Sequence, residues 1–226
     1  MDDIFPALMR AALWAPPLIL AITLHEAAHG FVALRCGDQT AYILGRVTLN
    51  PLKHIDPIGT LLLPGLLVVT GAPFLFGYAK PVPVNFRRLN SPRIDMVKVA
   101  IAGPAMNIFL ALASAAVIRF LGLMADESWA QFLTASLTFS IYINVLLAVF
   151  NMLPIPPLDG GRVAVGLLPD FLARPLDRLE RFGFVIVIGL LVLPGMLRID
   201  FNLFRDILQG PIEVIVRLIG TIVGLG

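Results

Sequence analysis

The chain has 226 residues, of which 58% are apolar and 14% are charged, and its formal net charge is +2. Soluble domains carry about 25% charged residues, so this composition, with a mean hydropathy of +0.88, excludes an ordinary soluble domain. It predicts an all-α polytopic membrane protein. The small net charge gives no indication of nucleic-acid binding, and the single cysteine, Cys36, excludes an intramolecular disulfide.

The first predicted membrane span runs from about residue 9 to residue 34 and contains His25-Glu26-Ala27-Ala28-His29. Histidines four residues apart share one helix face, so both imidazoles can bind one metal ion. The spacing is the H-E-x-x-H pattern of zinc metalloproteases, in which the glutamate is the general base. An ionisable residue at the centre of a span costs about 2.5–3.5 kcal/mol, which favours a metal site over packing histidines.

Two stretches follow whose structure is less regular. Residues 42–49 place apolar triplets on either side of Gly45-Arg46 and predict a short β-hairpin. Residues 58–77 are apolar but interrupted by prolines and glycines, so they form either a crossing span or a re-entrant element.

Basic residues favour the re-entrant alternative for residues 58–77. Further spans are expected at about 95–120, 131–153, 183–197 and 207–224, which makes five spans in all. With a re-entrant 58–77, twelve basic residues lie on one side and four on the other, whereas a crossing segment divides them ten to six; Arg217, inside the last span, is left out of both counts. The stronger asymmetry predicts that the metal motif faces the cytoplasmic side.

A second motif supplies the remaining candidate residues. A metalloprotease zinc site needs a third protein ligand, and Asp159, which follows a proline-broken helix end, is the best candidate; its alternative role is a helix cap or a partner for Arg162. Asn151 either holds the substrate backbone or the reaction oxyanion, or serves helix packing near Pro154. Asn107 and Asn144 are expected to form hydrogen bonds between helices.

Together these residues resemble the site-2 protease family of intramembrane zinc metalloproteases. The resemblance covers roughly residues 10–165 and rests on three motifs: His25-Glu26-x-x-His29, Gly103-Pro104-x-x-Asn107 and Asn151-x-x-Pro154-x-x-x-Leu158-Asp159-Gly160. It implies one zinc ion per chain held by His25, His29 and Asp159, with Glu26 as the base. It also implies cleavage of transmembrane segments of other proteins within the lipid bilayer, as in regulated intramembrane proteolysis.

The resemblance leads us to expect one membrane-embedded domain over residues 1–226, with a catalytic core at about 10–165 and C-terminal helices at about 183–224. Many relatives carry a PDZ or CBS domain, and this chain has neither. Residues 58–77, with the lead-in at residues 50–59, resemble a compact prokaryotic subgroup, which implies the prokaryotic cell (inner) membrane.

Two other functions are compatible with the motifs. A membrane metal carrier also places histidine and carboxylate within spans, although it would need polar residues along a whole path. A catalytically inactive relative acting as a scaffold is the other, and the intact Glu26 argues against it. The sequence leaves open the substrate, the oligomeric state and the choice between zinc and another divalent metal.

Overall fold

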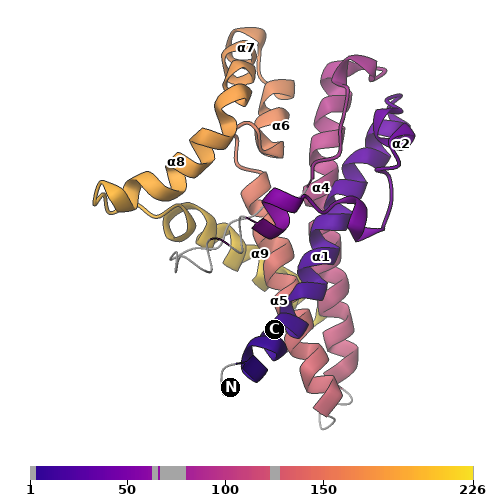
Figure 1. The fold of residues 1–226 in the computed structure, drawn as a ribbon, viewed down its shortest axis with the longest axis vertical. Helices are drawn as coiled ribbons and strands as arrows, with labels where there is room; N and C mark the ends of the chain where they lie inside the picture. Colours follow the sequence, from indigo (N-terminus) through magenta and orange to yellow (C-terminus); the bar gives the residue numbers. More distant parts are fainter. Residues whose placement is uncertain (1–3, 63–65, 67–79, 123–127, 226) are drawn as a thin grey trace.

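The computed structural model describes residues 4–62, 66, 80–122 and 128–225, and the regular elements in these ranges are all helical (Figure 1). The α-helices are α1 (Ile4–Arg35), α2 (Thr40–Ile43), α4 (Pro92–Leu121), α5 (Ser128–Asn151), α6 (Asp159–Leu167), α7 (Asp170–Leu179), α8 (Gly183–Met196) and α9 (Gln209–Val223). Short 3₁₀ turns lie at Pro51–Lys53, Phe86–Arg88 and Glu180–Phe182, and π-helical segments lie at Pro57–Leu62 and Phe204–Leu208.

Three helices are long and apolar enough to cross a membrane: α1 from Ala12 to Arg35, and the whole of α4 and α5. A fourth is added if residues 170–182 and 185–196, which meet at 74°, count as one bent span. The expected five spans are therefore not all found in the described part of the chain. Helix α8 has 14 residues and α9 has 15, so each is roughly 21–23 Å long and shorter than a hydrocarbon core of about 30 Å.

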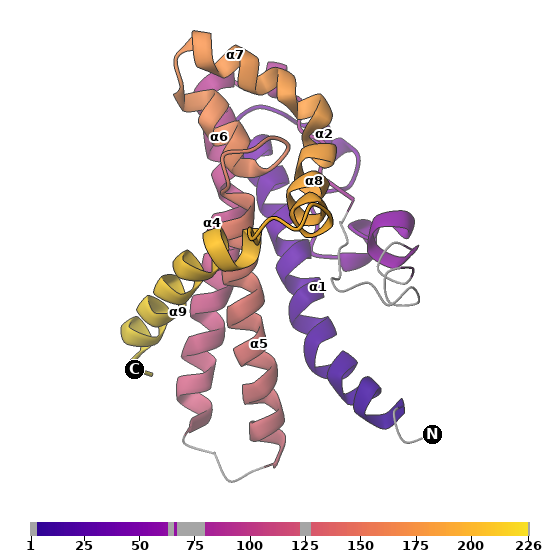
Figure 2. The same ribbon diagram turned by 90° about the vertical axis from the view of Figure 1, so that its left-hand side faces the viewer.

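The three long helices form the centre of the molecule. Helices α1 and α5 run toward the end where α2, α6 and α7 lie, and α4 runs in the opposite direction (Figures 1 and 2). Ala21, Ala111 and Ala115 are fully buried between them. Small residues let helix backbones approach closely, which is the usual basis of helix packing in membranes. The close approach brings side chains of α1 and α4 within hydrogen-bonding distance.

The C-terminal helices pack on this centre in two places. Leu208, Ile212 and Ile219 are buried against α4 and α5, so α9 lies along the outside of that pair (Figure 2). At the other end, Arg93 at the start of α4 donates to the carbonyls of Gly166 and Leu168 at the end of α6. These bonds fix α6, whose first residue is Asp159, relative to α4.

The β-hairpin predicted at residues 42–49 is wrong, because this part of the chain turns as a short helix. Asp38 Oδ1 accepts hydrogen bonds from Thr40 N at 3.0 Å and Thr40 Oγ1 at 2.5 Å, which starts the helical turn of α2. Gly45, with φ of +64°, then ends it. Local side-chain bonding therefore outweighs the apolar pattern. The question of whether 58–77 crosses or re-enters concerns mostly residues 63–65 and 67–79, outside the described ranges.

Candidate metal centre

His25 and His29 lie one turn apart on α1 and point into the space between α1, α4 and α6. Their Nε2 atoms are 3.0 Å apart, and both residues are buried. Asp159, the first residue of α6, reaches the same point, with Oδ2 3.3 Å from each Nε2. The structure thus brings together the three residues that the sequence proposes as metal ligands.

Hydrogen bonds on the far side of each ring determine where the imidazole protons lie. His25 Nδ1 is 2.5 Å from Asn107 Oδ1, and His29 Nδ1 is 2.7 Å from the Val99 carbonyl oxygen. Both partners can only accept, so each Nδ1 carries a proton, and in a neutral ring the lone pair then lies on Nε2. This is the arrangement that metal-bound histidines normally show.

The donor set fits a divalent cation. Two bare nitrogens and a carboxylate oxygen all lie within 4.8 Å of one another, and Asp159 Oδ2 is a buried atom without a hydrogen-bond partner in the described structure. Three acceptors directed at one point repel each other unless a positive charge lies between them. Two imidazoles and one carboxylate form a three-ligand set typical of catalytic zinc, which keeps a fourth position open.

Gly103 explains how α4 comes so close to this cluster. A Cβ atom at this position would lie 2.6 Å from His25 Nε2 and still closer to His29 Nε2. Only glycine therefore fits opposite the two rings. Pro104 follows inside the helix, where it removes the amide that would bond the carbonyl of Ala100. This short segment, Val99 to Pro104, forms the floor of the metal centre together with α1.

Glu26 faces a segment that is extended rather than helical. Its Oε2 accepts a hydrogen bond from the backbone N–H of Val82 at 2.7 Å. Val82 belongs to residues 80–85, hereafter the 80–85 strap, in which Pro81 and Pro83 alternate with valines. The bond orients the carboxylate and engages one of its two oxygens. This contact was not predicted from the sequence, although alternating prolines are a recognisable sign of extended backbone.

The 80–85 strap is fixed at both ends by side chains of the segment that follows α1. Arg46 Nη2 donates to the Lys80 carbonyl at 2.5 Å, and Asn85 N donates to Asp38 Oδ2 at 2.6 Å. Burial by itself raises the pKa of the Asp38 carboxyl, but hydrogen bonds from Thr40 and Asn85 hold that pKa below its usual range. The ionised Asp38 and the Arg46 guanidinium thus hold the strap against Glu26.

A cavity of about 490 Å³ opens beside the metal centre, a size suited to a peptide segment or small ligand. His25, Glu26, His29 and Asp159 line it. Its other lining side chains are mainly apolar and include Ile22, Val82, Val84, Phe86, Phe150 and Val187. The candidate catalytic groups therefore meet an apolar chamber.

Asn151 lies on the same cavity, at the end of α5. Its Nδ2 donates to the Leu147 carbonyl at 2.9 Å, one turn earlier in the helix. This bond keeps the amide nitrogen toward the helix, and the second N–H of the same group remains for another acceptor. Asn107 and Asn144 form hydrogen bonds between helices, as expected, and they do so with each other: Asn107 Nδ2 donates to Asn144 Oδ1 at 2.8 Å. The additional bond from His25 to Asn107 was not predicted.

Comparison with known proteins identifies a peptidase family and relatives that are named zinc metalloproteases. A model of peptidase family M50 matches residues 120–194. The "Putative zinc metalloprotease YwhC" of Bacillus subtilis is 42% identical over 180 residues, which cover 78% of each chain. The "Putative zinc metalloprotease Rip2" of Mycolicibacterium smegmatis is 34% identical over 189 residues, covering 82% of this chain and 68% of the relative. The Mycobacterium tuberculosis protein of the same name is 32% identical over 178 residues, covering 79% and 66%. No solved structure gives a significant match.

Proposed function

Because the chain belongs to peptidase family M50, the site-2 type of zinc metalloprotease, we propose that it cuts peptide bonds in or near transmembrane segments of other membrane proteins. One observation carries the proposal: a buried His25, His29 and Asp159 cluster, set among membrane-span helices, opens on a largely apolar cavity. An apolar chamber accepts the side chains of a transmembrane segment with little desolvation cost. We propose regulated intramembrane proteolysis as the setting.

The residues are given the following roles. His25, His29 and Asp159 hold one zinc ion, which when bound supplies the Lewis acid that activates water and polarises the scissile carbonyl. Glu26 takes the proton of the attacking water on the carboxylate oxygen that Val82 leaves unused, and passes it to the leaving amine nitrogen. Asn151 donates its second amide N–H to the oxyanion of the tetrahedral intermediate.

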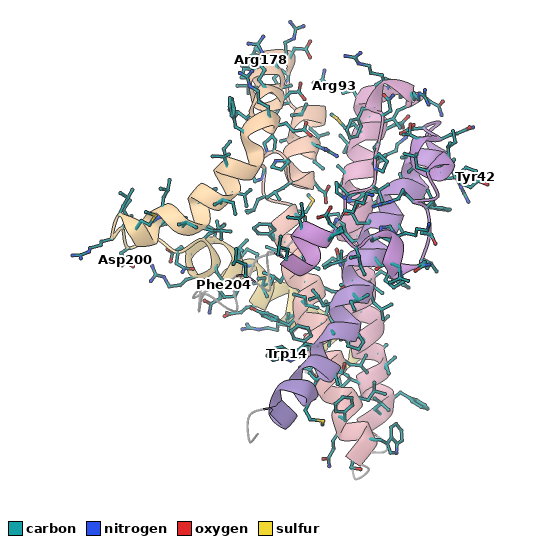
Figure 3. The ribbon with its side chains drawn as sticks, viewed as in Figure 1. Trp14, Tyr42, Arg93, Arg178, Asp200 and Phe204 are labelled. Atoms are coloured by element: carbon teal, nitrogen blue, oxygen red, sulfur yellow. The ribbon has the colours of Figure 1, made fainter. Side chains whose placement is uncertain are left out.

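The proposed location is a prokaryotic cell membrane, with the active site toward the cytoplasm. The relatives compared above are bacterial. Basic side chains collect where α4 begins and α7 lies, and Figure 3 labels Arg93 and Arg178 at that end. His29 precedes Arg35, the last residue of α1, by six residues, or roughly 9 Å along the helix. The positive-inside rule then favours a metal centre inside the membrane near its cytoplasmic face.

The decisive experiment compares two variants with wild-type protein on a model transmembrane substrate in detergent. Glu26→Gln keeps the size of the side chain and removes its basicity, so we expect a loss of about 10²–10⁴-fold in cleavage rate with zinc retained. Asp159→Ala should lose both zinc and cleavage. Equal cleavage by wild type and Glu26→Gln would contradict the role of Glu26. A membrane metal carrier would transport metal and cleave nothing even as wild type.

A further inference from the structure

The Nδ1 atoms of the two candidate zinc-binding histidines have different kinds of hydrogen-bond acceptor, and for His25 the acceptor is the side chain of Asn107. His29 is held by a backbone carbonyl, that of Val99, whereas His25 is held by the side chain of Asn107. A side-chain amide can present either oxygen or nitrogen, so it fixes the His25 proton only if something fixes the amide. Asn107 is fully buried on α4, and its surroundings supply that constraint.

A chain of hydrogen bonds sets the direction of the Asn107 amide. On α5, Asn144 Nδ2 donates to the Ser140 backbone carbonyl at 2.9 Å. Because a carbonyl can only accept, the Asn144 Oδ1 must face the other way, and it accepts from Asn107 Nδ2 at 2.8 Å. Asn107 Nδ2 also donates to the Ala21 carbonyl on α1, at 3.3 Å. The oxygen of Asn107 is therefore the atom left to face His25.

We propose that Asn107 is a positioning residue that holds His25 as its Nδ1–H tautomer, and that Asn144 determines the orientation of Asn107. The constraint runs from a backbone carbonyl of α5 through two buried amides to the imidazole on α1. Rotation of either amide would bring donor against donor and leave a buried carbonyl unpaired, which is unfavourable in a buried site. In the neutral ring the lone pair of His25 then lies on Nε2, which is directed at His29 and Asp159.

The inference rests on the zinc site and needs no assumption about the substrate. Its experiment measures zinc affinity of the purified full-length protein by competition with a chelating dye. Asn107→Leu keeps nearly the same volume and removes the acceptor, so we expect zinc to bind about 10–100-fold more weakly, the usual cost of losing the outer partner of a metal-bound histidine. Asn107→Asp keeps an acceptor for His25 Nδ1 and should restore most of the affinity.

Ser114→Ala is the matched control. Ser114 and Ser140 are both buried and share a hydrogen bond of 2.8 Å between α4 and α5. Removing that hydroxyl breaks a bond between the same two helices but leaves the Ser140 carbonyl, and hence the direction of both amides, unchanged. Zinc affinity close to that of wild type is expected. A loss as large as that of Asn107→Leu would overturn the proposal in favour of helix packing.

A spectroscopic readout separates positioning from packing. The chain has only three histidines, so proton–nitrogen spectra of zinc-loaded protein labelled at histidine are simple, and His54→Gln removes one ring system. The His25 Nδ1 proton, bonded at 2.5 Å, should resonate downfield in wild type and move upfield in Asn107→Leu. If Asn107→Leu does not fold, the same spectra and zinc affinities are measured on Asn144→Leu and Asn107→Asp. An unchanged His25 signal in Asn144→Leu would refute the role of Asn144. Zinc affinity equal to that of wild type in Asn107→Leu would refute the role of Asn107.

Discussion

The two sides of the catalytic cavity are built on different principles. On one side, the helix wall, formed by α1, α4 and α5, fixes His25 and His29 through buried bonds to Asn107 and Val99. On the other side, the 80–85 strap is extended and held mainly by single side-chain bonds to Glu26, Arg46 and Asp38. The two candidate histidine ligands belong to the first side, and Val82, the partner of the proposed general base Glu26, belongs to the second.

This difference separates two requirements of the reaction. Metal ligands must stay within a few tenths of an ångström of one geometry, and packed helices with paired polar groups provide that rigidity. The proposed peptide substrate would have to reach Glu26, and a segment held by a few bonds can yield to it at a modest free-energy cost. We therefore expect helix-wall substitutions to change zinc binding and strap substitutions to change local opening.

The largest effect is expected from Gly103→Ala in the helix wall. The added methyl would overlap both imidazole rings, and overpacking costs about 1–3 kcal/mol, or about 5–150-fold in zinc affinity if the rings move. Competition with a chelating dye measures this change in zinc affinity. Gly122→Ala, at the other end of α4, adds a methyl where nothing lies within 4 Å, so it should bind zinc normally. A zinc affinity in Gly103→Ala equal to that of wild type would show that the helix wall can move to accommodate the added methyl group.

A smaller effect, confined to the strap, is expected from Arg46→Gln. Losing the guanidinium bonds to the carbonyls of Lys80 and Pro81 should speed amide hydrogen exchange in residues 80–85 about 10–100-fold, the equivalent of about 1.5–3 kcal/mol. Zinc affinity should not change. Arg119→Gln, which removes a similar bond to the Gly224 carbonyl far from the strap, is the control. Loss of zinc in Arg46→Gln would show that the two sides are coupled.

The smallest effect is expected from Asp38→Asn, and it should depend on pH. The pKa of Asp38 is lowered in the folded protein, so its ionised carboxyl stabilises the fold at pH values above the unfolded pKa, about 3.9. That stabilisation is lost as pH falls through the folded pKa. We expect a difference of about 1 kcal/mol between wild type and variant at pH 5–7, which shrinks below pH 4 in thermal unfolding. A difference that persists unchanged at pH 3 would contradict this account.

Several features follow from the sequence alone. Periodicity within α1 places His25 and His29 on one face, because residues four apart in a helix are neighbours whatever the tertiary structure. Composition predicts helical membrane segments, because a lipid environment requires backbone groups to be satisfied within the segment. The interhelical role of Asn107 was also predictable, since a buried amide within a span needs a partner.

Other features were decided by tertiary structure. The β-hairpin prediction failed because Asp38 bonds locally to Thr40 and begins a helical turn, which the apolar pattern of residues 42–49 does not reveal. The predicted set of five spans depended on α8 and α9, which have 14 and 15 residues and are each too short to cross a membrane alone. The bond between Glu26 and Val82 joins residues 56 positions apart. Pairings of this kind arise from the approach of two segments in space, and a single sequence carries no periodic signal of them.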